Sequence, residues 1–339
     1  MTAPAPSPAL IVWCHVDTNF NPSGDSRSWL VGTFGVPFYL FIALMFVALG
    51  FARDPKRAVG PYLIGRVKKL YVPFLVWTVV YALLTYAKHR DEPFQFPLHY
   101  LWAGSYTHLY FLPLLLTCTV LLSLVVKPLM RHAALRYAVI TLLVAGTAAI
   151  AWVDMPESFR RIDPERSDLT TLRDFYRAAP AALGALAFAL AFGRKGKRLQ
   201  TVASVSLVGG AVTVICVAAQ ILGRPMMLAR TLSGFGWTLL ALGPWRGAWL
   251  KPLAWVGRHS FGIYLAHIAF IRAADMGLRM RGVEPTVPVQ LFVWAVAFTG
   301  AFVLSALLAQ SPWTEWIVGY EGEKVRRTMG VAPSAASAA

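Results

Sequence analysis

The residues best suited to chemistry are a histidine near the start of the chain and a basic stretch further along it. His15 is followed by Asp17, and Arg66, Lys68 and Lys69 stand together between two uncharged runs. A histidine at a polar edge can remove a proton from a hydroxyl group near neutral pH, and an aspartate beside it can orient the ring. Arginine and lysine side chains suit the phosphates of a bound anion. The pattern therefore predicts a catalytic base at His15, oriented by Asp17, and an anion site at the basic stretch.

Both features also have a plain interpretation in a membrane protein. An interfacial histidine is more often a solvated or hydrogen-bonded boundary residue than a catalyst, and an aspartate such as Asp17 is more often an exposed loop residue than its partner. Lysine and arginine at the end of an apolar segment mark the cytoplasmic face without binding a ligand. The sequence has no Gly-rich phosphate loop, no zinc-type histidine pair and no GxSxG motif, and we expect no metal site. The chemistry therefore depends on which segments bring these residues together.

The composition of the 339-residue chain is that of a polytopic membrane protein. Hydrophobic residues make up 57% and charged residues only 14%, with a mean hydropathy of +0.56, whereas a soluble domain carries about 25% charged residues. The net charge of +16 could suggest nucleic acid, but lysine and arginine are spread over the loops between apolar segments. We therefore expect no nucleic-acid partner. Cys14, Cys118 and Cys216 stand singly in apolar stretches and fit small core residues.

Uncharged runs predict an all-α bundle of about ten transmembrane helices. A helix needs about 20 apolar residues to cross a hydrocarbon layer of roughly 30 Å. The first candidate, residues 2–16, would reach only about 22 Å at 1.5 Å per residue and contains three prolines, so we expect either a partial span or a natural start further upstream. The other candidates are residues 34–52, 70–87, 109–126, 137–153, 178–193, 199–223, 231–245, 252–271 and 287–313.

The distribution of lysine and arginine over alternate loops orients this bundle. One set of loops holds nineteen of the 32 lysines and arginines, and the other set holds thirteen. The positive-inside rule then places the Arg66 loop and both termini in the cytoplasm, and residues 154–177 outside. We expect residues 1–318 to form the membrane domain and residues 319–339, basic and then rich in Ala, Ser and Pro, to form a disordered cytoplasmic tail.

Two further stretches, at residues 108–113 and 257–267, carry histidines and aromatic residues at the start of apolar runs. Taken alone, each could be an aromatic-belt segment at a membrane interface. Taken in order along the chain, the whole set resembles the acyltransferase 3 family of integral membrane acyltransferases. The features that carry the resemblance are the first-span histidine, V-P-F-Y-L-F at 36–41, the basic run with Y-V-P-F at 71–74, H-L-Y-F-L-P at 108–113 and S-F-G-I-Y-L-A-H at 260–267.

This resemblance implies an O-acyltransferase of the bacterial inner membrane. Such an enzyme moves an acyl group, usually acetyl, from cytoplasmic acyl-coenzyme A to a hydroxyl of a cell-surface or exported polysaccharide or its lipid-linked precursor. It implies no permanently bound cofactor, acetyl-coenzyme A as donor substrate, and membrane lipids and polysaccharide assembly proteins as further partners. His15 matches the family's essential histidine, and Arg66 with Lys69 matches its R-x-x-R element near the donor. The residues expected to bind substrate are His108, Tyr110, Tyr264 and His267.

The chain departs from the family's pattern at three points. No arginine precedes His15 within residues 2–6, Ala43-Leu44 replaces the family's Ser-Gly in the second span, and Lys69 replaces the second arginine of R-x-x-R. The alternative function is a transporter or flippase of a glycan or lipid-linked sugar, with His15, His108 and the outer loop forming its binding site. An internal repeat or a matching pair of Gly/Pro-broken spans would favour such a transporter, and the sequence shows neither.

The enzyme hypothesis carries a geometric requirement. A donor site and a histidine on opposite faces of a layer of roughly 30 Å cannot meet unless the bundle is invaginated or the acyl group is relayed. A short first segment with prolines could line such a cavity, because irregular backbone at membrane depth is tolerated where it is buried or lines water.

Overall fold

The computed structural model describes residues 9, 11–13, 15–16, 34–88, 93–94, 96–153, 167–193, 203–221, 226–244, 250–284, 286–311 and 313–319. The regular elements in these ranges are all helices, which confirms the prediction of an all-α fold. Cys118 and Cys216 are buried and unpaired, while Cys14 lies outside the described residues. The predicted tail beyond residue 319 also lies outside them.

Seven helices in the described ranges are long and apolar enough to cross a membrane, which confirms a polytopic membrane bundle. Two further helices, α11 (Ala203–Ile221) and α12 (Met226–Ala241), correspond to the predicted runs 199–223 and 231–245 and pack against each other. The seven long helices are α3 (Gly35–Arg53), α4 (Val59–Lys88), α6 (Phe111–Arg131), α7 (Ala133–Trp152), α9 (Ser167–Phe192), α14 (Ser260–Arg279) and α15 (Val287–Leu308).

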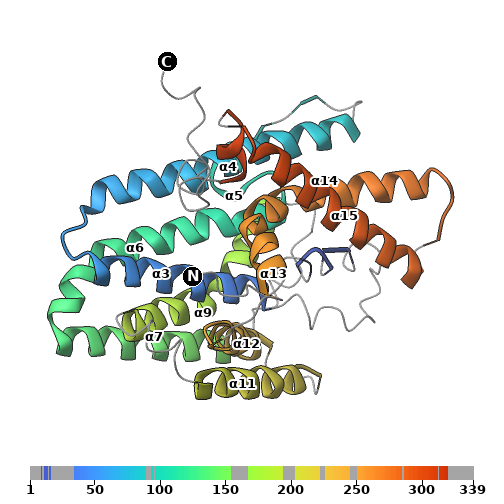
Figure 1. Cartoon of the computed structure of the whole chain (residues 1–339). Helices are drawn as coiled ribbons and strands as arrows, with labels where there is room; N and C mark the ends of the chain where they lie inside the picture. Colours follow the sequence, from blue (N-terminus) through green and yellow to red (C-terminus); the bar gives the residue numbers. More distant parts are fainter. Residues whose placement is uncertain are drawn as a thin grey trace.

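Helix α3 forms the centre of one part of the bundle. It contacts α6, α9 and α12, while α7 packs on α9 and α4 packs on α6 (Figure 1). The side chains of Phe38, Leu40 and Leu44 are fully buried in α3, because a helix that is apolar on every side can be covered by neighbours all round. Helix α7 is also apolar enough to span a membrane but carries exposed leucines such as Leu142. Its place at the edge of the bundle fits a face turned to lipid.

The α14–α15 pair, at the right of Figure 1, packs against α4. The single run predicted at residues 252–271 is divided at His259 into α13 (Leu250–Arg258) and α14. His259 Nδ1 lies 3.3 Å from Ser305 Oγ of α15, which ties the break to the neighbouring helix. A Cβ at Gly262 would collide with Ser305, so α14 and α15 can approach closely only because residue 262 is glycine.

The prediction that the basic stretch is a loop ahead of a helix starting at Leu70 is wrong. Helix α4 begins at Val59 and carries the stretch 66–69 within it. Its 30 residues span about 45 Å, more than the roughly 30 Å hydrocarbon layer, so the helix extends beyond the apolar run. The extra turns are anchored by the ring of Tyr62, which packs edge-on against Phe51 of α3 at 5.1 Å. The uncharged run therefore marked the lipid-covered part of the helix rather than its start.

The connection between α4 and α6 folds back onto α4. It contains α5 (Tyr100–Ala103) and the 3₁₀ helix η1 (Thr107–Tyr110). Gly104 between them has φ +81°, and a Cβ there would lie 2.6 Å from the Cβ of Leu109. Ser105 Oγ donates a hydrogen bond to the carbonyl of Thr78 in α4. This turn therefore holds the start of η1 against the middle of α4.

Candidate active site

Three histidines from segments far apart in the sequence meet inside the bundle. His15 lies in the first helical segment, His108 in η1 and His267 in α14. Their ring centroids lie 5.0 Å apart for His15 and His267, 5.4 Å for His108 and His267, and 6.1 Å for His15 and His108. His108 and His267 are buried and His15 is half-buried. We call these three residues the histidine cluster.

The hydrogen bonds of His267 indicate which of its nitrogens can accept a proton. Its Nδ1 lies 2.7 Å from the carbonyl oxygen of Tyr264 and 3.1 Å from that of Ile263. A carbonyl only accepts, so Nδ1 carries the hydrogen in the neutral ring and Nε2 is left as an acceptor. Nε2 of His267 and both ring nitrogens of His108 are buried without a hydrogen-bond partner in the described structure. Buried polar atoms of this kind are rare, and ionisable groups within membrane spans mark functional sites.

Tyrosines surround His108 and join the elements that carry the cluster. The rings of Tyr81, Tyr106 and Tyr264 lie 5.2, 5.5 and 5.5 Å from that of His108. The Tyr264 hydroxyl donates a hydrogen bond to the His108 carbonyl, and the Tyr81 hydroxyl donates one to the Leu265 carbonyl at 2.7 Å. Tyr264, predicted to bind substrate, thus also ties α14 to η1. Neither Tyr81 nor Tyr106 was predicted as a site residue. A tyrosine such as Tyr81 within an apolar run has the sequence pattern of an ordinary residue of a membrane helix.

Of the other predicted site residues, Tyr110 stands apart from this arrangement. The ring of Tyr110 contacts Phe175 of α9 at 5.8 Å, on the α9 side of η1. Asp17, the predicted partner of His15, lies outside the described residues. Among the residues that are described, no group of three His, Cys, Asp or Glu side chains is arranged to hold a metal ion.

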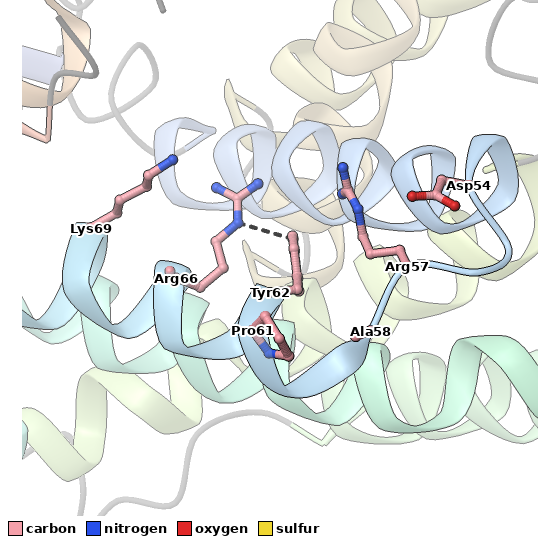
Figure 2. Close-up of a pocket in the computed structure, with 8 residues that line it drawn as sticks. Asp54, Arg57, Ala58, Pro61, Tyr62, Arg66 and Lys69 are labelled. Carbon is pink, nitrogen blue, oxygen red and sulfur yellow. Dashed lines mark hydrogen bonds between the residues drawn. The ribbon is translucent and has the colours of Figure 1, made fainter. Parts of the chain in front are cut away.

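A basic cavity of about 640 Å³ lies where the connection after α3 meets the start of α4 (Figure 2). Arg66 and Lys69 of the basic stretch line it, whereas Lys68 is exposed and is not among its lining residues. The helical repeat explains the difference, because residues 62, 65, 66 and 69 fall on one face of α4 and residue 68 does not. The lining residues are Asp54, Arg57, Ala58, Pro61, Tyr62, Gly65, Arg66 and Lys69.

Tyr62 organises the cations of this basic cavity. Arg66 Nε donates a hydrogen bond to the Tyr62 hydroxyl at 2.9 Å. The guanidinium carbons of Arg57 and Arg66 lie 5.4 and 5.2 Å from the centre of the Tyr62 ring, within the range of cation–π attraction. Figure 2 shows Arg57, Arg66 and Lys69 reaching toward the same side of α4. With Asp54 as the one acid among the lining residues, the cavity has an excess of positive charge suited to a phosphate-bearing ligand.

Helix α4 connects the basic cavity with the histidine cluster. Lys69 lines the cavity and Tyr81 contacts His108, and the two are twelve positions apart on α4. This separation corresponds to about 18 Å along the helix axis. The sequence had suggested that a donor site and His15 would be separated by the whole hydrocarbon layer, roughly 30 Å. The distance is shorter because the histidines lie within the bundle and not at its far surface.

Comparison with known proteins gives this arrangement a family. The pattern of the acyltransferase 3 family, described as an acyltransferase domain, matches residues 9–310. The match covers all three histidines and the residues of the basic cavity. No curated protein and no solved structure matches the chain significantly. Because the match spans most of the sequence, the chain belongs to the acyltransferase 3 family and is a membrane acyltransferase.

Proposed function

We propose that this acyltransferase moves an acyl group, acetyl in the first instance, from acyl-coenzyme A to a hydroxyl of a cell-surface or exported polysaccharide or its lipid-linked precursor. One observation carries the proposal. Helix α4 contacts the histidine cluster through Tyr81 and lines a cavity rich in cations with Lys69, and these two residues are about 18 Å apart along its axis. That combination supplies an acceptor for a proton and a site for phosphates within reach of one ligand.

The basic cavity is the proposed site for the phosphates of coenzyme A. Arg57, Arg66 and Lys69 supply charge-assisted hydrogen bonds to them. The pantetheine arm is about as long as four extended residues, or roughly 15 Å. An arm of that length brings the thioester from the cavity to the neighbourhood of the histidine cluster. The donor can then stay bound at one end of α4 while its acyl group reacts near Tyr81.

In the proposed reaction, His15 removes the proton from the acceptor hydroxyl. The hydroxyl oxygen attacks the thioester carbonyl and forms a new C–O bond, and the C–S bond then breaks. The departing coenzyme A thiolate takes the proton back from His15, so no other reactant is needed. His267 presents an acceptor nitrogen 5.0 Å, ring to ring, from His15, and can hold the hydroxyl or the protonated imidazole in place. Asp17 remains the proposed partner that orients His15.

The orientation in the membrane is part of the same proposal. Positive loops favour a cytoplasmic basic cavity and cytoplasmic termini, in a bacterial inner membrane. The donor would then enter from the cytoplasm and the glycan from the other side, with His108, Tyr110, Tyr264 and His267 on its path. Membership of an acyltransferase family favours this reaction over the transport of a glycan or lipid-linked sugar.

The test uses purified protein with labelled acetyl-coenzyme A, together with the O-acyl content of surface polysaccharide in a complemented deletion strain. His15→Ala should lower the turnover number about 10²- to 10⁴-fold, because a general base contributes that much. His132→Ala is the matched control, since His132 is exposed at the start of α7 and far along α6 from η1. Absence of transfer by the wild type, or full activity of His15→Ala, would overturn the proposed reaction.

A further inference from the structure

Arg272 is a cation inside a membrane-spanning helix whose contacts in the described structure are with an aromatic side chain. Its Nε donates a hydrogen bond to the Tyr106 hydroxyl at 3.2 Å, and its guanidinium carbon lies 4.5 Å from the centre of the Tyr106 ring. The neighbouring arginine of α14, Arg279, instead pairs with Asp275 at 2.8 Å. No ion pair of this kind joins Arg272 to a described acidic residue. Ionisable side chains in membrane-spanning helices are rare and usually serve a ligand or a water-filled path.

Arg272 lies on the side of the histidine cluster that faces away from the basic cavity. It follows His267 by five residues on α14, about 7.5 Å along the axis. The other end of α14 lies toward the cavity, because Phe261 packs on Gly319, whose Cβ position is 3.5 Å from the carbonyl oxygen of Lys69. The histidines therefore lie between the proposed donor site and Arg272.

One aromatic ring separates Arg272 from the cluster. The Tyr106 ring that holds Arg272 lies 5.5 Å from the ring of His108 and 5.5 Å from that of Tyr81. Because Nε is taken by the Tyr106 hydroxyl, the two terminal amino groups of the guanidinium remain to bind a ligand. Their planar geometry suits the two oxygens of a carboxylate or a phosphate.

A second group of charges lies on the other flank of η1. Arg173 and Arg177 lie 3.6 and 3.5 Å from the carboxylate of Asp174, so two cations share one acid. The adjacent Phe175 packs against Tyr110 of η1. Among the side chains that the structure describes next to η1, cations therefore outnumber acids on both sides of the segment that carries His108. Such a field attracts anions and raises their local concentration.

We propose that the acyl acceptor carries an anionic group and that Arg272 binds it, which places a neighbouring hydroxyl at the histidine cluster. The group is a carboxylate, as in a uronic acid, or a phosphate, as in a lipid-linked sugar. This inference rests on the proposed function, since it names the class of acceptor for that reaction. It assigns Arg272 to substrate specificity, separate from the donor cations of the basic cavity.

The test measures ligand-induced thermal stabilisation of the purified full-length protein in detergent, without turnover. The probes are glucuronate, glucose 1-phosphate and glucose, added with saturating coenzyme A so that the basic cavity is occupied. A ligand that binds only the folded state raises its melting temperature. At least one anionic probe should stabilise the wild type more than glucose does, and which of the two does so distinguishes carboxylate from phosphate.

In Arg272→Gln the effective anion should need about a tenfold higher concentration for the same shift, the loss expected for one charged hydrogen-bonding group. Arg279→Gln is the matched control and should behave as wild type, because Arg279 is exposed and paired on the same helix. Tyr106→Phe keeps the charge but releases Nε, and should weaken anion binding about threefold. If Arg272→Gln does not fold, Tyr106→Phe tests whether Arg272 binds the anion.

Equal shifts with all three sugars, no shift with either anion, or an unchanged anion shift in Arg272→Gln would overturn the anionic acceptor. The outcome is independent of acetyl transfer, which is measured separately. An active enzyme with no Arg272-dependent shift would refute this inference alone. An Arg272-dependent shift in a protein without transfer activity would instead refute the proposed reaction.

Discussion

Lys68 and Lys69 are adjacent in sequence but should respond very differently to substitution by alanine. Lys69 lines the basic cavity, whereas Lys68 is exposed and is not among its lining residues. Both lysines add equally to the positive charge that orients the membrane helices. The two variants should therefore insert equally well, and any difference in activity reports donor binding.

The size of the difference follows from the contacts. A hydrogen bond from a charged group to a phosphate contributes about 1.5–3 kcal/mol, and 1.36 kcal/mol corresponds to a factor of ten. Lys69→Ala should raise the KM for acetyl-coenzyme A about 10- to 150-fold. Lys68→Ala removes an exposed charge, a change within about 0.5 kcal/mol, so its KM should change no more than about twofold. Lys69 lies about 18 Å along α4 from Tyr81, the residue of this helix that contacts His108, so kcat should remain unchanged in both variants.

The assay is steady-state transfer of labelled acetyl groups at varied donor and saturating acceptor, with insertion checked by membrane fractionation. A rise in KM without a change in kcat is the signature of lost binding that is equal in the ground and transition states. Equal effects of the two substitutions would refute the assignment of helix faces. An unchanged KM in Lys69→Ala with normal insertion would show that the basic stretch sets the orientation of the helices in the membrane and does not bind the donor.

Three further predictions concern the parts that support the two sites. Tyr62→Phe removes the hydroxyl that accepts a hydrogen bond from Arg66 and should raise the donor KM about three- to tenfold; a KM equal to wild type would exclude an ordering role. Gly104→Ala adds a Cβ 2.6 Å from the Leu109 Cβ at φ +81°, and should lower the melting temperature, which a thermal-unfolding scan in detergent would reveal. Burial lowers the pKa of His259 below its ordinary value of 6.5, so the folded state favours the neutral ring. The stability of the fold should therefore be highest above pH 6.5 and decline as the pH falls. His259→Gln should flatten this part of a pH series of melting temperatures.

The class of fold follows from the sequence because the bilayer imposes a simple length. A run of about 20 uncharged residues that crosses the bilayer forms a helix, because a helix hydrogen-bonds its backbone N–H and C=O groups within the segment, where lipid offers them no partner. Residues 34–52, for example, correspond closely to α3 at Gly35–Arg53. The rule says nothing about where a helix continues into water. Helix α4 therefore begins at Val59, eleven residues before its predicted start at Leu70.

The candidate site was predictable in its members more than in its arrangement. The order of motifs pointed to His15, His108 and His267, but nothing in their spacing shows that their rings come within 6.1 Å of one another. Tyr81 carries no sequence signal at all, because a tyrosine in an apolar run is an ordinary helix residue. Its contact with His108 depends on the turn at Gly104, which folds η1 back onto α4.

Hydrophobic length and residue order are properties of the chain alone, so they are enough to identify a helical membrane protein with the motif order of an acyltransferase. Packing was needed to show that three histidines share one cluster, that Lys69 and not Lys68 lines the basic cavity, and that Arg272 lies beyond the histidines. Which side chains meet depends on helix faces, crossing geometry and the turns between helices, and these arise from packing between distant segments.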